Sequence, residues 1–429
     1  MSEFLNFNRR NLIGVTGAGL VATGMAQAAA PVRKLGAEAG KVTIKSVITF
    51  DVVVPQPPGV RPPSASVVGT PGRINVTCVE TTAGNGYSFL GSTAEQVAAA
   101  QPVLAGNDLF HIEMYLKAGL INWGAIEEAM WDAIGRIAGQ PVSRLLGGAT
   151  LPTVPVYITY TWPNSNRQND VTPKRQAEQV PIIKAAGFNA MKIQIMRDDF
   201  HGDVDACGEI LAAGGPGFRV MVDRTANAAG LWTYDQALAA AQALSKVGCY
   251  WLEEPLARDD YEGPARLRKE GGGVIITGGE GYHGLEPYKQ CVLHGTYDIL
   301  QPEIRQVAGI FTARKVGVLA ETWGLRMAPH GTSGLAWAGR IQVSAAMGSH
   351  MQEIAVLNPP TMPDDLCRPF LPLLHGEQPF KYVDGACIVP QKPGLGLNID
   401  ETALKRYRVI GLEVRNRRPQ QQQGAAPAQ

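Results

Sequence analysis

The sequence predicts an α/β protein in which a parallel β/α barrel accompanies a second domain. Short apolar runs recur from about residue 154 to residue 352, and the stretches between them are each long enough for one helix. An ionisable residue stands at or just after the end of seven of these runs, at intervals of 23 to 31 residues. Runs of this kind are typical of strands buried on both faces. Strands that alternate with helices build a parallel sheet, and a closed barrel is one favoured form of it.

Length and composition agree with this fold class. The chain has 429 residues, which exceeds the ~250 residues of a typical barrel and leaves room for another domain. Apolar residues make up 45% and charged residues 18% of the chain, as in an ordinary globular enzyme. The formal net charge is only +1, so nothing indicates a nucleic acid or an anionic membrane as a partner.

The first 28 residues are interpreted as an export signal and not as part of the fold. Arg9 and Arg10 precede an uncharged stretch rich in Gly and Ala, which ends in the small-residue pattern Ala26-Gln27-Ala28. Paired arginines before a mildly apolar segment are typical of twin-arginine signals. We therefore expect a periplasmic or secreted bacterial protein that has no membrane association once exported. A disordered basic N-terminus is the alternative.

Residues 41–150 are expected to form an α+β domain. Residues 41–53 and 74–80 have the pattern of strands, and 94–116 and 121–139 have the apolar spacing of helices. Residues 55–68 contain five prolines and no periodicity, which indicates a long loop, and such loops are often functional.

The barrel is expected over residues 151–384, with residues 385–416 returning onto the N-terminal domain and 417–429 forming a disordered tail. The predicted barrel strands are Val154–Tyr160, Phe188–Met191, Phe218–Val222, Cys249–Leu252, Val274–Thr277, Tyr297–Leu300, Leu325–Ala328 and Met351–Gln352. The six cysteines form no CxxC motif and show no regular spacing, so we expect no essential disulfide.

Three carboxylates end consecutive predicted strands: Asp223, Glu253 and Glu280. Polar residues at the C-terminal ends of barrel strands point into the active site. Three carboxylates brought together there would repel one another unless they were protonated or neutralised by a cation. Ligation by oxygen alone suits a hard divalent ion, most simply Mg²⁺. The sequence therefore predicts a magnesium site.

A second group of ionisable residues follows neighbouring strands. Glu303 and His330 end the next two, and a carboxylate beside an imidazole fixes its tautomer and raises its basicity, as a general base requires. Lys192 lies on an earlier strand and could hold a substrate carboxylate or stabilise an oxyanion. Gln194 shares the strand face of Lys192 and can form hydrogen bonds, but it cannot accept a proton. Lys192 as the base is the alternative to His330.

These motifs together resemble the enolase superfamily, in its mandelate racemase and muconate lactonizing enzyme branch, over about residues 41 to 412. The resemblance is carried by motifs at the strand ends and the domain junction, namely Trp251-Leu252-Glu253-Glu254-Pro255, Gly279-Glu280, Gln301-Pro302-Glu303, Ala328-Pro329-His330, Trp131-Asp132, Leu145-Leu146-Gly147-Gly148 and Pro393-Gly394-Leu395-Gly396. It implies a modified (β/α)7β barrel with an α+β capping domain built from the N-terminal region and the C-terminal return. It also implies Mg²⁺-dependent removal of the proton α to a carboxylate, with Glu353 bonded to the enediolate oxygen.

The chain departs from the family pattern at three positions. Gln194 stands where the family usually has a second Lys that acts as a base, Glu303 replaces the usual Asp, and Thr225 follows Asp223 where an Asn is usual, with Asn227 further along. Racemisation needs a proton-transfer group on each face of the substrate. His330 provides one on its face, but Gln194, on the other face, cannot accept a proton. We therefore expect dehydration of a sugar acid to a 2-keto-3-deoxy acid, a carbon–oxygen lyase reaction.

Two alternatives stay open: epimerisation or cycloisomerisation of an acid sugar or lactone, and metal-dependent sugar-acid binding without catalysis. The partner is expected to be a small carboxylate substrate, and the family often forms homo-oligomers. Further candidates for substrate contacts are Arg61, Tyr160, Trp162, Thr225, Asn227 and His283.

Overall fold

The computed structural model describes residues 41–55, 72–117, 124–161, 171–194, 197, 199–225, 231–357 and 360–409. From Val42 on, these residues belong to one compact unit. The predicted export signal, the predicted tail, and the candidates Arg61, Trp162 and Asn227 lie outside the described residues.

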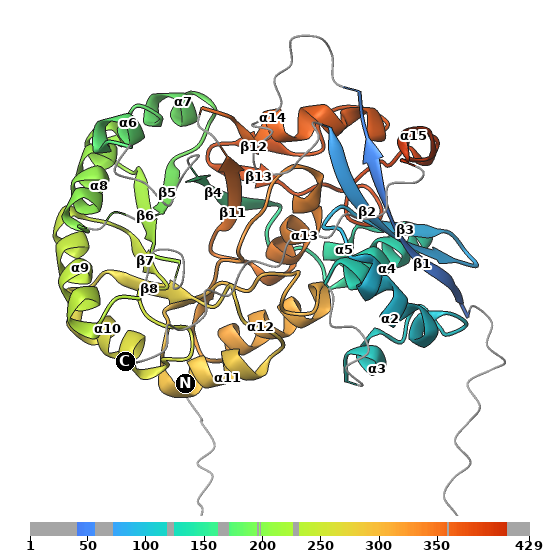
Figure 1. Ribbon diagram of the computed structural model, residues 1–429, viewed down its shortest axis with the longest axis horizontal. Coiled ribbons are helices and arrows are strands. Elements are labelled where there is room, and N and C mark those ends of the chain that lie inside the picture. The colour runs from blue at the N-terminus through green and yellow to red at the C-terminus, as the bar shows by residue number, and fades with distance from the viewer. Residues whose placement is uncertain are drawn as a thin grey trace, which may run out of the picture. The chain divides into compact units, whose positions relative to one another are not determined.

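The N-terminal part forms an antiparallel three-stranded sheet in the order β1-β2-β3, with helices packed on it (Figure 1). Its elements are β1 (Ile44–Val53), β2 (Arg73–Thr81), β3 (Asn85–Ser88), α2 (Ala94–Leu104), α3 (Ile112–Lys117), α4 (Gly124–Ala138) and α5 (Val142–Leu145). The expectation of one helix over 94–116 is wrong. Helix α2 starts at a capping box formed by Thr93 and Gln96 and ends at Leu104. Ala105 is already extended, and Gly106 then adopts a φ of 82° that a helix cannot continue through.

The barrel strands are parallel and follow one another in chain order from β4 to β10, while β11 pairs with β4. They are β4 (Thr153–Thr161), β5 (Ala190–Gln194), β6 (Arg219–Asp223), β7 (Trp251–Glu253), β8 (Ile275–Gly278), β9 (Ile299–Leu300), β10 (Arg326–Met327) and β11 (Gln352–Leu357). A parallel bridge between Thr332 and Ile354 joins the chain after β10 to β11, so the run of strands returns to its start. The predicted barrel strands are thus confirmed.

Helices lie outside the barrel strands, as Figure 1 shows for α6 to α12. These elements are α6 (Pro173–Ala177), α7 (Val180–Ala185), α8 (His201–Gly214), α9 (Tyr234–Val247), α10 (Glu262–Glu270), α11 (Glu286–His294), α12 (Ile310–Thr322), η2 (Gly334–Trp337), α13 (Ala338–Met347), α14 (Pro363–Cys367) and η3 (Arg368–Leu373). Local sequence sets their ends: α9 begins at a capping box of Thr233 and Gln236 and stops at Gly248 in the left-handed region. In the part of the chain that the structure describes, no helix has the length and apolar character needed to span a membrane.

The C-terminal segment contains β12 (Lys381–Val383), β13 (Ala386–Ile388) and α15 (Glu401–Tyr407). We expected residues from 385 on to return to the N-terminal domain, but β13 pairs antiparallel with barrel strand β4. The chain reaches the N-terminal elements only later. The backbone N–H of Leu395 donates to Asp132 on α4 at 2.9 Å, and that of Val409 donates to the carbonyl of Asp51 on β1 at 2.9 Å.

A buried carboxylate fastens the capping helix α4 to the barrel helix α12. Glu127 accepts hydrogen bonds from the backbone N–H groups of Ile310 (2.7 Å) and Phe311 (2.9 Å), at the start of α12. The indole of Trp131 donates to the same carboxylate at 2.8 Å. Gly309 precedes α12, and a Cβ at that position would lie 2.1 Å from a Glu127 oxygen, so the close approach requires glycine. The six cysteines are free and buried.

Candidate active site

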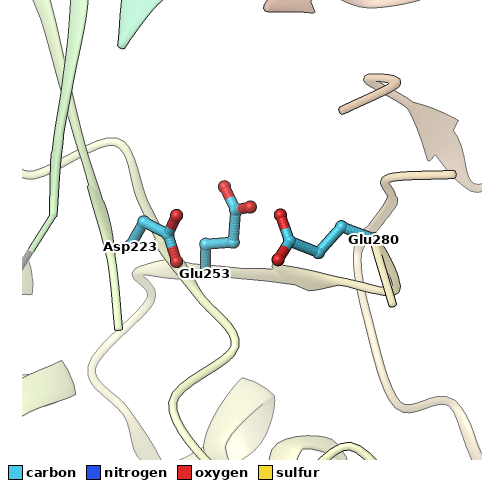
Figure 2. A group of neighbouring side chains, drawn as sticks. All are labelled: Asp223, Glu253 and Glu280. Carbon is cyan, nitrogen blue, oxygen red and sulfur yellow. The ribbon is translucent and has the colours of Figure 1, made fainter. Parts of the chain in front are cut away.

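The three predicted metal ligands meet at the C-terminal ends of β6, β7 and β8 (Figure 2). Asp223 and Glu253 are the last residues of neighbouring strands and are paired in register, and Glu280 follows β8 by two residues. One oxygen from each carboxylate lies within 4.8 Å of the others. Parallel pairing without a shift explains this convergence, because every strand then ends at the same rim of the barrel.

Lys192 is the cation that neutralises part of this negative charge. Its Nζ lies 2.8 Å from Glu253, 3.0 Å from Glu353 and 3.3 Å from Asp223, and its side chain is only 1% exposed. Burial opposes the charge of this ammonium, but the carboxylates outweigh burial and hold the pKa of Lys192 well above its usual value. Burial, followed by repulsion from Asp223, raises the pKa of Glu253 well above the ordinary range.

His330 and Glu303 form the predicted pair. The Nδ1–H of His330 donates to Glu303 at 2.5 Å, which leaves Nε2 directed at the carboxylate cluster, 3.2 Å from Glu280 and 3.9 Å from Glu353. Burial disfavours the imidazolium, but Glu280, Glu353 and Glu303 together raise the pKa of His330 to about 10. Without a cation, these carboxylates keep His330 protonated near neutral pH. A cation held by the three carboxylates would offset their charge and leave Nε2, 3.2 Å from Glu280, able to accept a proton.

Glu353 faces the same centre from β11. It accepts hydrogen bonds from the hydroxyl of Thr159 and, at 2.7 Å, from the backbone N–H of Gly331. Burial raises the pKa of Glu353, but Lys192 and His330 outweigh this effect and lower it to about 2. Glu353 is thus an anionic acceptor in contact with Lys192.

Gln194 and Thr225 complete the rim beside Asp223. Gln194 is paired in register with Asp223, and its Oε1 atom is buried without a hydrogen-bond partner among the described residues. Thr225 adopts an unusual positive φ of 48°, and its backbone N–H donates to Asp223 at 2.6 Å. Its Oγ1 is likewise buried without a hydrogen-bond partner in the described part of the chain. Both side chains therefore retain unused hydrogen-bonding capacity next to the proposed metal ligands.

Two of the expected substrate contacts do not face this site. Tyr160 lies on β4 one residue after Thr159, so its side chain points to the other face of the strand, where its hydroxyl donates to the Met362 sulfur at 3.4 Å. Thr159, which the sequence analysis did not select, is the inward-facing residue. His283 is exposed and forms no interaction with the site residues, because the chain turns away from the barrel rim after Glu280.

The sequence analysis did not identify three residues that contact the carboxylates of the site and fix their positions. The guanidinium of Arg340 on α13 is buried and pairs with Glu303, and together with His330 it lowers the pKa of Glu303 far below its ordinary value, against the effect of burial. Arg258 bridges Glu254 and Glu280, at 2.6 and 2.7 Å. Gln301 donates to Glu253 at 2.7 Å. Arg340 and Arg258 lie in helical or loop segments without a motif of their own, whereas Gln301 stands in the Gln-Pro-Glu motif and could have been selected.

The arrangement suits a divalent cation held by oxygen. The cluster offers three carboxylates, and Glu253 Oε1 is buried without a hydrogen-bond partner in the described structure. A cavity of about 240 Å³ adjoins the site, lined by Glu280, Glu303, Arg305, Gln306, His330, Gly331, Thr332 and Arg340. The cavity reaches one carboxylate of the cluster, Glu280, and the imidazole of His330, so a small organic acid bound in it would lie beside both.

Comparison with known proteins agrees with this geometry. The model of the enolase C-terminal domain-like family matches residues 174–403. The chain belongs to this family. Its relatives place it in the mandelate racemase and muconate lactonizing enzyme branch of the enolase superfamily, as the motifs had indicated.

Relatives within the superfamily catalyse more than one reaction. D-Galactarolactone cycloisomerase of Agrobacterium fabrum is 31% identical over 286 residues, 66% of this chain and 73% of the relative. Arabinonate dehydratase of Saccharolobus solfataricus is 26% identical, over 66% of this chain and 71% of the relative. A racemase from Streptomyces coelicolor, solved with bound magnesium, superposes with a TM-score of 0.66 at 25% identity, over 85% of this chain and 100% of that one. The superfamily barrel with its capping domain is therefore the fold of this chain.

Proposed function

We propose that this protein is a Mg²⁺-dependent acid sugar dehydratase, which removes the α-proton of a sugar acid and eliminates water to give a 2-keto-3-deoxy acid. One observation carries the proposal: His330 Nε2 lies 3.2 Å from a member of the three-carboxylate cluster, while the rim position next to Asp223 holds Gln194 and not a second base. The relatives, which include sugar acid dehydratases, support the reaction class.

Asp223, Glu253 and Glu280 would hold the metal. Mg²⁺ bound there would polarise the substrate carboxylate and stabilise the negative charge that develops when the α-proton leaves. Lys192 lies on the opposite side of the cluster from His330, close enough to Glu253 and Asp223 to contact a carboxylate oxygen of the substrate.

His330 takes the α-proton at Nε2. Glu303 holds Nδ1–H and stabilises the imidazolium that forms, and Arg340 keeps Glu303 ionised. If the β-hydroxyl lies on the same face, His330 returns its proton to that hydroxyl as it leaves as water. Gln194 and Thr225 have unused polar atoms at the rim and would bind hydroxyl groups of the substrate.

Cycloisomerisation is the second candidate, because a relative that is 31% identical to this chain over 286 residues is a D-galactarolactone cycloisomerase. Removal of the α-proton would then expel a ring oxygen of the substrate itself and not a free hydroxide. The same base and metal ligands would serve both reactions. Which reaction occurs would depend on whether the leaving group of the substrate is a free hydroxyl or a ring oxygen.

The test is to incubate the pure protein and Mg²⁺ with a panel of aldonic acids, aldaric acids and their lactones in deuterated water, and to identify products by mass spectrometry. A product that has lost one water and carries a keto group supports dehydration. A product with the atoms of a lactone substrate but an opened ring supports cycloisomerisation. Deuterium exchange at the α-carbon without elimination indicates epimerisation, and ligand-induced thermal stabilisation without turnover indicates binding alone. Activity that survives in His330→Asn would refute the assignment of the base.

We also propose that the chain is exported folded through the twin-arginine pathway, on the basis of Arg9, Arg10 and the apolar segment behind them. Cell fractionation of a bacterium that expresses the full chain tests this. Replacing both arginines with lysine should retain the protein in the cytoplasm with its catalytic activity intact. Equal export of both forms would contradict the proposal.

A further inference from the structure

A cationic cluster lies at the end of the barrel opposite the active site. Arg219 is the first residue of β6 and Arg326 the first of β10, while Tyr250 directly precedes β7 and His350 lies two residues before β11. Strand β6 ends at Asp223, and its rise of roughly 3.3 Å per residue separates the two ends by ~13 Å. This cluster is therefore distinct from the site of the three carboxylates.

Tyr250 holds the cluster together. The Arg219 guanidinium lies over its ring, with Cζ 4.8 Å from the centroid, and Arg326 Nη1 donates to its hydroxyl at 3.2 Å. The same hydroxyl lies 2.5 Å from His350 Nε2. Two guanidinium groups from β6 and β10 are thus fixed against a single ring.

Among the residues that the structure describes, no carboxylate pairs with the two arginines of the cluster. In the described part of the chain, neither Arg219 nor Arg326 forms an ion pair, whereas Asp298, which precedes β9, is paired with Arg268 at 2.8 Å. Arg219 makes one further contact, from Nη1 to the Met351 sulfur at 3.9 Å. Each guanidinium has five N–H donors, so most of them remain available. Burial and the two arginines lower the pKa of His350 to about 4, consistent with a site short of negative charge.

We propose that this cluster binds a small oxyanion, such as inorganic phosphate, between Arg219 and Arg326. The planar guanidinium fork matches the spacing of oxygens in phosphate and carboxylate groups, and charge-assisted bonds to it are the strong ones. Ser349, next to His350, has a buried hydroxyl oxygen without a hydrogen-bond partner among the described residues. The bound anion neutralises the two guanidiniums and ties β6 to β10 across the base of the barrel.

The experiment measures the melting temperature of the full chain against inorganic phosphate, with chloride added to keep ionic strength constant. Variants are Arg219→Gln, Arg326→Gln and the double substitution. Arg266→Gln is the matched control, because Arg266 is an exposed arginine on α10 that pairs with Glu270. Asp223→Asn, compared with the parent protein in the presence of Mg²⁺, reports on phosphate that binds at the active site through the metal, because Asp223 is one of the proposed metal ligands.

Phosphate should raise the melting temperature of the parent, Arg266→Gln and Asp223→Asn proteins alike. Each single arginine variant should bind phosphate about tenfold more weakly, since one charge-assisted bond is lost, and the double variant should show no stabilisation. Phosphorus NMR of the parent protein measures binding directly, and Arg326→Lys, which keeps the charge but loses the fork, should show an intermediate affinity. Absence of binding to the parent, persistence in the double variant, or loss in Asp223→Asn would each overturn the proposal.

Discussion

Replacing Glu303 with Gln tests the proposed role of the His330–Glu303 pair. The change keeps the shape of the side chain but removes the charge that His330 Nδ1 contacts at 2.5 Å and that Arg340 pairs with from behind. Loss of a comparable group behind a functional histidine typically costs 10- to 100-fold. We therefore expect kcat to fall by about 10- to 100-fold while KM changes little, because Glu303 is not one of the three carboxylates that would hold the metal, and its charge is directed at His330 and Arg340.

The same substitution should also destabilise the fold. Arg340 is only 2% exposed, and Glu303 is its carboxylate partner in the described structure. Removing one member of a buried pair typically costs about 3–5 kcal/mol, because the other charge stays buried. Urea unfolding measures this loss, and circular dichroism at the assay temperature checks that the variant remains folded. Glu321→Gln, an exposed change on α12, is the matched control and should alter neither property.

A double-mutant cycle decides whether Glu303 acts through His330. His330→Asn removes the base itself and should lower kcat by at least about 10²-fold. Because Glu303 would then have no imidazole to hold, the double variant should be no slower than His330→Asn alone. Independent, multiplicative losses in the double variant would refute this reasoning, and so would an unchanged kcat in Glu303→Gln. Glu303→Asp keeps the charge and should recover much of the loss.

Three further outcomes follow from the structure. Glu253→Gln should abolish activity and Mg²⁺-dependent stabilisation. It should raise the stability of the metal-free protein by ~1 kcal/mol, because it removes a charge that burial and repulsion from Asp223 disfavour, and the gain is small because the ion pair with Lys192 is lost as well; a loss of metal-free stability in urea would contradict this. Glu127→Ala should cost ~3 kcal/mol in urea unfolding, since it leaves the buried N–H groups at the start of α12 without an acceptor, whereas a loss below ~1 kcal/mol would show that water replaces the carboxylate. Burial and two arginines lower the pKa of His350 from its ordinary value of 6.5 to about 4. The unfolded chain therefore binds more protons between these pH values, and stability should fall as the pH drops from 6.5 to 4. This loss should be no more than ~2 kcal/mol after allowance for partial exposure, and it should vanish in His350→Gln when unfolding is followed across this pH range.

The sequence predicted the barrel and the carboxylates at its rim because both depend on local patterns. Each buried strand is an apolar run, and each of Asp223, Glu253 and Glu280 stands at or near the end of one. Residues whose role depends on tertiary approach were missed. Arg340 lies on a helix with no special pattern, and only the packing of α13 brings it to Glu303.

Three other predictions failed for separate reasons: the inward-facing residue of β4, the extent of the helix expected over 94–116, and the path of the C-terminal segment. Tyr160 was chosen although its neighbour Thr159 faces the site, because a strand buried on both sides shows no alternation from which the inward face could be identified. The helix expected over 94–116 is interrupted at Gly106, a residue that tertiary context could have accommodated within a helix. Pairing of β13 with β4 joins segments more than 200 residues apart, and no local signal marks such a contact.

The hydrogen bonds between Glu127 on α4 and the start of α12 limit where the chain can be cut without loss of stability. The segment recognised by the family model starts at residue 174, so an expression fragment cut there would include α12 but not the acceptor of its first N–H groups. It would also lack strand β4, which pairs with β5 on one side and β11 on the other. The segment that the family model matches, residues 174–403, is therefore shorter than the compact unit that begins at Val42. Truncations meant to isolate the catalytic half should retain everything from Val42 onward.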